Sequence, residues 1–131
     1  MQFKECYQNP ISGERADPYL KLGPDGFYYF TASYPMKSAD DKDGYDRVIL
    51  RRAKDISELA SAEEITIWKV ADTTLTHRFI WAPELHYIAG LWYVFYAGSE
   101  DKENNWAFDC HVLVCDSNDP YTGTWSEKGK F

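Results

Sequence analysis

The sequence is poor in cysteine, and its three cysteines are not spaced for a structural role. Cys6, Cys110 and Cys115 are odd in number, form no Cys-x-x-Cys pair and have no histidine at zinc spacing, so we expect neither a disulfide framework nor a zinc site. A phosphate-binding glycine loop, a Gly-x-Ser-x-Gly elbow and other metal-ligand spacings are also absent. The sequence therefore predicts no metal and no other cofactor.

Positive charge is scarce as well. The net charge is −7, whereas nucleic-acid grooves and anionic membrane surfaces need clustered Lys and Arg, so we expect neither partner. The one basic cluster is Arg47, Arg51 and Arg52. On an alternating strand these side chains point to different faces, which favours salt pairing with the acidic surface.

Long apolar runs are missing throughout. The N-terminal stretch MQFKECYQNPISG has no apolar run resembling a signal peptide, and no segment approaches the length of a membrane span. From these absences we predict a chain that stays in the cytoplasm.

Aromatic and β-branched residues are abundant and occur in short alternating runs. These runs predict strands at 26–33, 47–53, 64–68, 84–88, 91–98 and 111–117. Helix formers gather only at 53–64, which is too short for a major helix. The sequence indicates an all-β protein.

The strand pattern repeats. GFYYFTAS aligns with GLWYVFYA, and RVILRRAKDI aligns with HVLVCDSNDP, both at an offset of about 64 residues. We therefore predict one domain over 1–131 with two units, at about 14–70 and about 78–131. Each unit has room for about four strands, the number in a β-propeller blade.

Two blades cannot close a propeller, which ordinarily needs at least about four. An open pair would leave apolar blade faces in water, which soluble monomers avoid. We therefore expect a partner to cover them, either missing C-terminal blades or a second copy in a homo-oligomer.

The quoted repeats resemble glycoside hydrolase family 43, in particular its arabinofuranosidase-like members. The resemblance is carried by RADPYLKL before GFYYFTAS, by YDRVILRRAKDI, and by IWAPELHYIAGLWYVFYAG one blade later. It implies a five-bladed propeller, of which this chain holds two four-stranded antiparallel blades. It also implies an active site at the central axis and an inverting mechanism that uses two carboxylates about 6.5–9.5 Å apart.

Asp17 matches the general base of the family's first-blade Asp-Pro motif, and Pro18 would help to fix its direction. The alternative is a turn-forming acid, because Asp-Pro also begins turns.

Glu84, in the second unit, is a candidate for the second catalytic carboxylate. The resemblance places the proton donor and the Asp that tunes its pKa in later blades, so Glu84 is not expected to be the acid. We expect Trp81 and Glu84 to line the substrate site, with the indole as an apolar face for a sugar ring and the carboxylate as a hydroxyl acceptor. Core packing is the alternative for Trp81.

Tyr34, Tyr45 and Arg47 flank the loop SYPMKSADDKDGYDR. We expect these three residues to rim the substrate pocket, although a charged, glycine-containing loop is also typical of a solvated surface.

The expected function is hydrolysis of terminal α-L-arabinofuranosyl or β-D-xylosyl linkages of hemicellulose, with Asp17 as general base and carbohydrate as substrate. The alternative is a non-catalytic propeller fragment or carbohydrate-binding module that lacks the general acid. A third possibility is a related propeller glycosidase or a glycan phosphorylase, but the acidic chain shows no basic pocket for phosphate.

Overall fold

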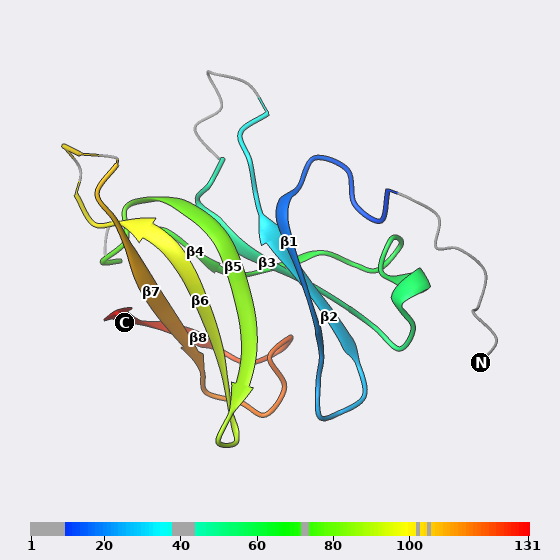
Figure 1. Cartoon of the computed structure of the whole chain (residues 1–131). Helices are drawn as coiled ribbons and strands as arrows, with labels where there is room; N and C mark the ends of the chain where they lie inside the picture. Colours follow the sequence, from blue (N-terminus) through cyan, green and yellow to red (C-terminus); the bar gives the residue numbers. More distant parts are fainter. Residues whose placement is uncertain (1–9, 38–43, 72–73, 102, 105) are drawn as a thin grey trace.

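The strands form two antiparallel sheets, one for each sequence repeat (Figure 1). The computed structural model describes residues 10–37, 44–71, 74–101, 103–104 and 106–131. The first sheet has the order β1 (Ala16–Leu22), β2 (Tyr28–Ser33), β3 (Arg47–Ala53) and β4 (Ile65–Lys69). The second sheet has the order β5 (Arg78–Ile88), β6 (Leu91–Ser99), β7 (Phe108–Cys115) and β8 (Trp125–Lys130). The all-β prediction with two four-stranded antiparallel sheets is confirmed.

Helix is limited to one turn within the described residues, η1 (Ile56–Glu58). The Asp55 side chain caps it by accepting from the Ser57 N–H at 2.9 Å. The segment at 53–64 is thus a short connection between β3 and β4, in agreement with its short run of helix formers. No helix in the described part of the chain is long and apolar enough to cross a membrane.

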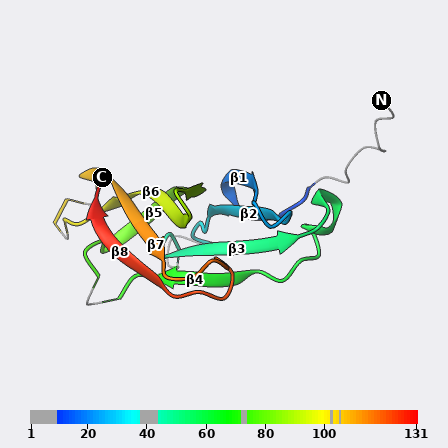
Figure 2. The same cartoon turned by 90° about the horizontal axis from the view of Figure 1, so that it is seen from below.

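The two sheets pack against each other along their first strands. β5 lies beside β1 and β2 in space, although about 60 residues separate them in the chain (Figures 1 and 2). Alternation along each strand turns one set of apolar side chains into the space between the sheets. This central core contains Tyr29, Val48, Leu50, Ile80, Leu85, Trp92, Val94, Tyr96 and Leu113.

A second, smaller core covers the other face of the first sheet. It contains Phe30, Ala32, Ile49, Ala53 and Leu59. Because both faces of β2 are covered, β2 reads in the sequence as an almost unbroken apolar and aromatic run. The outer rim of this core remains open, and Leu20 and Leu22 of β1 are exposed there.

Arginine side chains tie the elements together as the sequence predicts. Arg47 pairs with Asp46, Arg51 pairs with Glu64, and Arg52 reaches across to Asp119 beyond β7. The expected salt pairing of the basic cluster is confirmed. The Arg52 bond is bidentate, at 2.9 and 3.0 Å to the two Asp119 oxygens, and it joins the two sheets.

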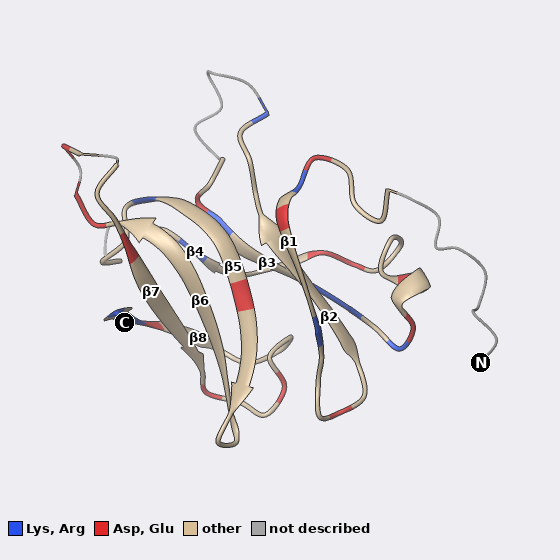
Figure 3. Ribbon diagram, viewed as in Figure 1, with Lys and Arg blue, Asp and Glu red and all other residues tan. Residues whose placement is uncertain are grey.

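Charged segments of the ribbon are spread over both sheets, and acidic segments lie on the first strand of each, at the start of β1 and in β5 (Figure 3). Cys110 and Cys115 are free thiols, and Cys6 lies outside the described residues.

Glu127 of β8 anchors the connection between the sheets. Its carboxylate accepts from the Leu75 N–H at 2.7 Å, from the Thr76 N–H at 3.0 Å and hydroxyl at 2.6 Å, and from the Tyr96 hydroxyl at 2.9 Å. Burial alone raises the pKa of Glu127, but these hydrogen bonds, first those of Thr76, lower it below the ordinary 4.5. The carboxylate form is therefore the one that the fold stabilises.

We expect Glu127→Gln to lower the free energy of unfolding by about 2 kcal/mol at neutral pH, because an amide offers the four donors only one acceptor oxygen. A depressed folded-state pKa stabilises above the unfolded-state value, and this stabilisation is lost as pH falls through the folded-state pKa. The difference between wild type and variant should accordingly shrink below a pH of about 4.5. Urea denaturation across this pH range measures it. Glu58→Gln, in exposed η1, is the control, and an equal loss in both variants would contradict the prediction.

Candidate active site

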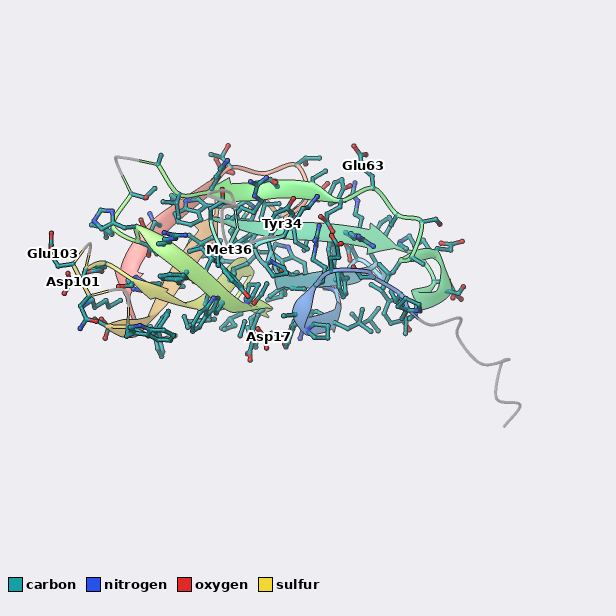
Figure 4. The ribbon with its side chains drawn as sticks, turned by 90° about the horizontal axis from the view of Figure 1, so that it is seen from above. Asp17, Tyr34, Met36, Glu63, Asp101 and Glu103 are labelled. Carbon is teal, nitrogen blue, oxygen red and sulfur yellow. The ribbon has the colours of Figure 1, made fainter. Side chains whose placement is uncertain are left out.

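Asp17 lies in a bulge near the start of β1. Ala16 pairs with Ser33 and Tyr19 with Thr31, so Asp17 and Pro18 together interrupt the ladder. The backbone of Asp17 has φ 50°, in the left-handed region that Asp and Asn tolerate better than most residues. Its side chain is exposed and lies between the β1 and β5 ribbons (Figure 4). The bulge turns this carboxylate away from the regular alternation of the strand.

The same irregularity recurs on the second sheet. The register of β5 shifts between Trp81 and Glu84, and Ala82, which precedes Pro83, has φ 47°. Asp17-Pro18 and Ala82-Pro83 are therefore structural counterparts, in agreement with the alignment of the two repeats. Only the first of the two carries an acid.

Ser33 connects these two counterparts. It is fully buried at the end of β2, and its Oγ lies 2.8 Å from Asp17 Oδ2 and 2.8 Å from the Ala82 nitrogen. Sequence reasoning missed Ser33. A signal existed, since the aligned runs GFYYFTAS and GLWYVFYA end in Ser33 and Ala97, so the first repeat carries a hydroxyl that the second repeat lacks at this position.

Trp81, on the same strand as Ala82, belongs to an aromatic cluster that also includes residues of β7 and of two loops. Its ring stacks on Phe108 at 4.4 Å between centroids and meets Tyr45, Phe79 and Trp106 at 5.7, 5.6 and 6.1 Å. Its Nε1 is buried and has no hydrogen-bond partner among the described residues. Most of the indole is thus used in packing, while Trp106 at the edge of the cluster is 78% exposed.

Tyr34 and Arg47 form a second group with Arg15. The two guanidinium groups lie over the Tyr34 ring at 4.3 and 4.4 Å from its centroid, and Arg47 also pairs with Asp46. The Tyr45 N–H donates to the Tyr34 carbonyl at 2.6 Å, which closes the base of the loop. Residues 38–43 of this loop lie outside the described residues.

Glu84 stands apart from these groups. Its side chain is 54% exposed and lies 3.1 Å from His86 Nε2. Burial, and to a lesser degree the charge of Glu84, raises the pKa of Tyr19 on β1. Among the described residues, Glu84 makes no hydrogen bond with Asp17 or Trp81.

The structure thus brings Tyr34 to Arg47 and Tyr45 to Trp81, and links Asp17 to the residue after Trp81 through Ser33. An exposed, oriented carboxylate can activate a water or accept hydroxyl hydrogen bonds, but it cannot also protonate a leaving oxygen in an inverting reaction. A profile of the glycosyl hydrolases family 43 matches residues 7–131.

The chain belongs to glycosyl hydrolases family 43. It is 41% identical over 124 residues to an extracellular exo-α-(1→5)-L-arabinofuranosidase of Streptomyces avermitilis, a match that covers 95% of this chain and 24% of that protein. The corresponding protein of Streptomyces chartreusis is 42% identical over 124 residues, with 95% of this chain and 35% of that protein covered.

The fold of the chain is that of two blades of a five-bladed family 43 propeller, which confirms the predicted fold class. The α-L-arabinofuranosidase of Lactobacillus brevis superposes with a TM-score of 0.79 at 38% identity, over 95% of this chain and 38% of that one. The chain therefore spans 24–38% of the length of these relatives.

The expectation of a cytoplasmic location is wrong. Both Streptomyces relatives are named as extracellular enzymes, which points to secretion. The physical reason for the error is that an export signal is a removable segment separate from the folded domain. The composition of folded family 43 blades consequently carries no information on export.

Proposed function

We propose that this chain supplies the first two blades of a family 43 glycoside hydrolase that removes terminal α-L-arabinofuranosyl residues with inversion of configuration, with Asp17 as general base. The observation that carries the proposal is an exposed Asp17 at a bulge, oriented by a buried serine, in a chain 38–42% identical to arabinofuranosidases. β-D-Xylosyl linkages are the second substrate class to test.

Asp17 takes a proton from a water molecule while the water oxygen attacks the anomeric carbon. The bond from that carbon to the leaving oxygen breaks, and a carboxylic acid from a later blade gives its proton to that oxygen. The reaction leaves Asp17 protonated, the distant acid ionised and the released sugar inverted.

The other predicted site residues take supporting parts in this proposal. Trp81 and Tyr45, in edge contact at 5.7 Å, offer an apolar surface to a sugar ring. Tyr34 and Arg47 rim the pocket, and the exposed Glu84 accepts hydrogen bonds from sugar hydroxyls.

The partner of the open sheet faces is, in this proposal, the remaining blades of a longer protein. The short coverage of the relatives supports this over self-association. The remaining blades would also cover the exposed Leu20 and Leu22 on the first sheet. We use the term completed enzyme for a protein in which residues 1–131 are followed by those blades, either from its own longer chain or joined after Phe131 to those of the Lactobacillus brevis relative.

The test compares the 131-residue chain with the completed enzyme on aryl α-L-arabinofuranoside and aryl β-D-xyloside. We expect turnover of the arabinofuranoside by the completed enzyme, with inversion seen by NMR of the released sugar, and none above background by the short chain, which lacks an assigned acid.

The intact Lactobacillus brevis enzyme is the positive control. Turnover by the short chain would show that Glu84 or a second copy supplies the proton. A completed enzyme with the circular dichroism of a folded β protein but no turnover would refute the proposal and favour a carbohydrate-binding fragment, which equilibrium binding of arabino-oligosaccharides would then detect.

A further inference from the structure

The hydrogen-bond direction at Ser33 is fixed by its two partners. The Ala82 nitrogen carries a backbone N–H that can only donate, so Ser33 Oγ accepts there, at 2.8 Å. The single hydroxyl hydrogen is then directed to Asp17 Oδ2, at 2.8 Å. Among the described residues, Asp17 Oδ1 accepts no hydrogen bond. One carboxylate oxygen is thus held and the other is left for a ligand.

Ser99 provides an internal comparison, because it is the buried serine that ends the second strand of the second sheet, two residues beyond Ala97, the counterpart of Ser33. Ser33 pairs with Ala16 and Ser99 with Arg78, each serine ends the second strand of its sheet, and their exposed fractions are 0% and 1%. The Ser99 hydroxyl instead lies 3.3 and 3.2 Å from the carbonyls of Asp101 and Asn104. Ala97, the counterpart of Ser33, has no hydroxyl, so the blade fold does not require one at this position. The first sheet has a hydroxyl there, and it holds the carboxylate.

We propose that Ser33 is a positioning residue for Asp17. Its hydroxyl holds Oδ2 so that Oδ1 faces the attacking water, and it couples the first-blade carboxylate to β5 next to Trp81. The inference rests on the proposed role of Asp17 as general base. Without the hydroxyl, the exposed carboxylate samples other rotamers, so the productive geometry is populated less.

The experiment is a double-mutant cycle in the completed enzyme. We expect Ser33→Ala to lower kcat about 10-fold, the equivalent of one hydrogen bond to a charged group, with little change in KM. Ser33→Thr, which keeps the hydroxyl, should restore most of kcat. In the Asp17→Asn background, Ser33→Ala should cause no further loss of kcat, because a residue that acts through Asp17 has nothing left to position.

Ser99→Ala is the matched control, because it removes an equally buried hydroxyl that does not contact Asp17. We expect it to lower Tm while kcat stays the same. If Ser33→Ala does not fold, Ser33→Cys keeps the volume with a weaker donor and decides the question by its kcat.

The results distinguish a failure of the role of Ser33 from a failure of the proposed role of Asp17 as general base. Unchanged kcat in Asp17→Asn would remove Asp17 from the mechanism and with it the proposed function. A large loss in Asp17→Asn with wild-type kcat in folded Ser33→Ala or Ser33→Cys would overturn only the role of Ser33. An equal fractional loss from Ser33→Ala in both backgrounds would also overturn it, since Ser33 would then act independently of Asp17.

Discussion

Replacing Asp17 by Asn in the completed enzyme is expected to lower kcat at least about 100-fold while the fold is preserved. The amide has nearly the shape of the carboxylate, its oxygen still accepts from Ser33 Oγ, and Asn tolerates φ 50° as well as Asp does. What it loses is the ability to take a proton from water. Steady-state kinetics on aryl α-L-arabinofuranoside, with Tm as a check on folding, measures the effect.

Asp25→Asn is the matched control for this substitution. Asp25 lies in the turn between β1 and β2, at the end of β1 opposite to Asp17, where it accepts from the Tyr29 hydroxyl at 2.6 Å. We expect Asp25→Asn to lower Tm and to leave kcat unchanged. Equal kcat values for wild type and Asp17→Asn would exclude Asp17 as the base.

Trp92→Ala should produce the largest loss of stability, about 3–5 kcal/mol in the free energy of unfolding. Trp92 has no exposed surface and packs between the sheets against Tyr29, at 5.2 Å between ring centroids, and Tyr87, at 4.9 Å. Its Nε1 donates to the Asn118 carbonyl at 2.9 Å. The substitution removes this bond and leaves a cavity at the contact between the blades.

Urea denaturation of the completed enzyme, followed by circular dichroism, measures this loss. Trp106→Ala is the control, because Trp106 is 78% exposed and its removal should cost no more than about 0.5 kcal/mol. Similar costs for the two substitutions would show that the space between the sheets is not the main core.

The strands with strong alternation were predictable from the sequence. β1 and β8, which lie at the edges of their sheets, were harder to predict. β2, β3 and β6 lie within one or two residues of the predicted runs because their aromatic and β-branched side chains fill the core. β8 escaped prediction as a run because WSEKGK is mostly polar, and only Trp125 and Gly129 of this strand are buried. A strand with so few buried apolar side chains lacks the alternation of apolar and polar residues that identifies a half-buried strand.

The positions of the candidate residues in the fold were predictable from the sequence, but their contacts were not. The repeat placed Asp17 near the start of β1 and Trp81 near the start of β5, one residue before the counterpart of Asp17, and both lie there. The link between them depends on a serine at the end of β2, and the pairing of Tyr34 with Arg15 and Arg47 depends on how the loop folds back. Such contacts come from register shifts and tertiary packing, which a period-two pattern does not encode.

The bulge before Pro18 and its counterpart before Pro83 have a consequence for how this architecture acquires chemistry. A duplicated blade inherits the residue with the left-handed backbone together with its place on the first strand of the sheet. A single substitution at that residue is then enough to direct a new functional group to the same region. In the first blade that residue is Asp17, and in the second it is Ala82, which has the same left-handed backbone, at φ 47°, but no polar side chain. Blades built in this way offer an evolving enzyme several equivalent starting points for one pocket.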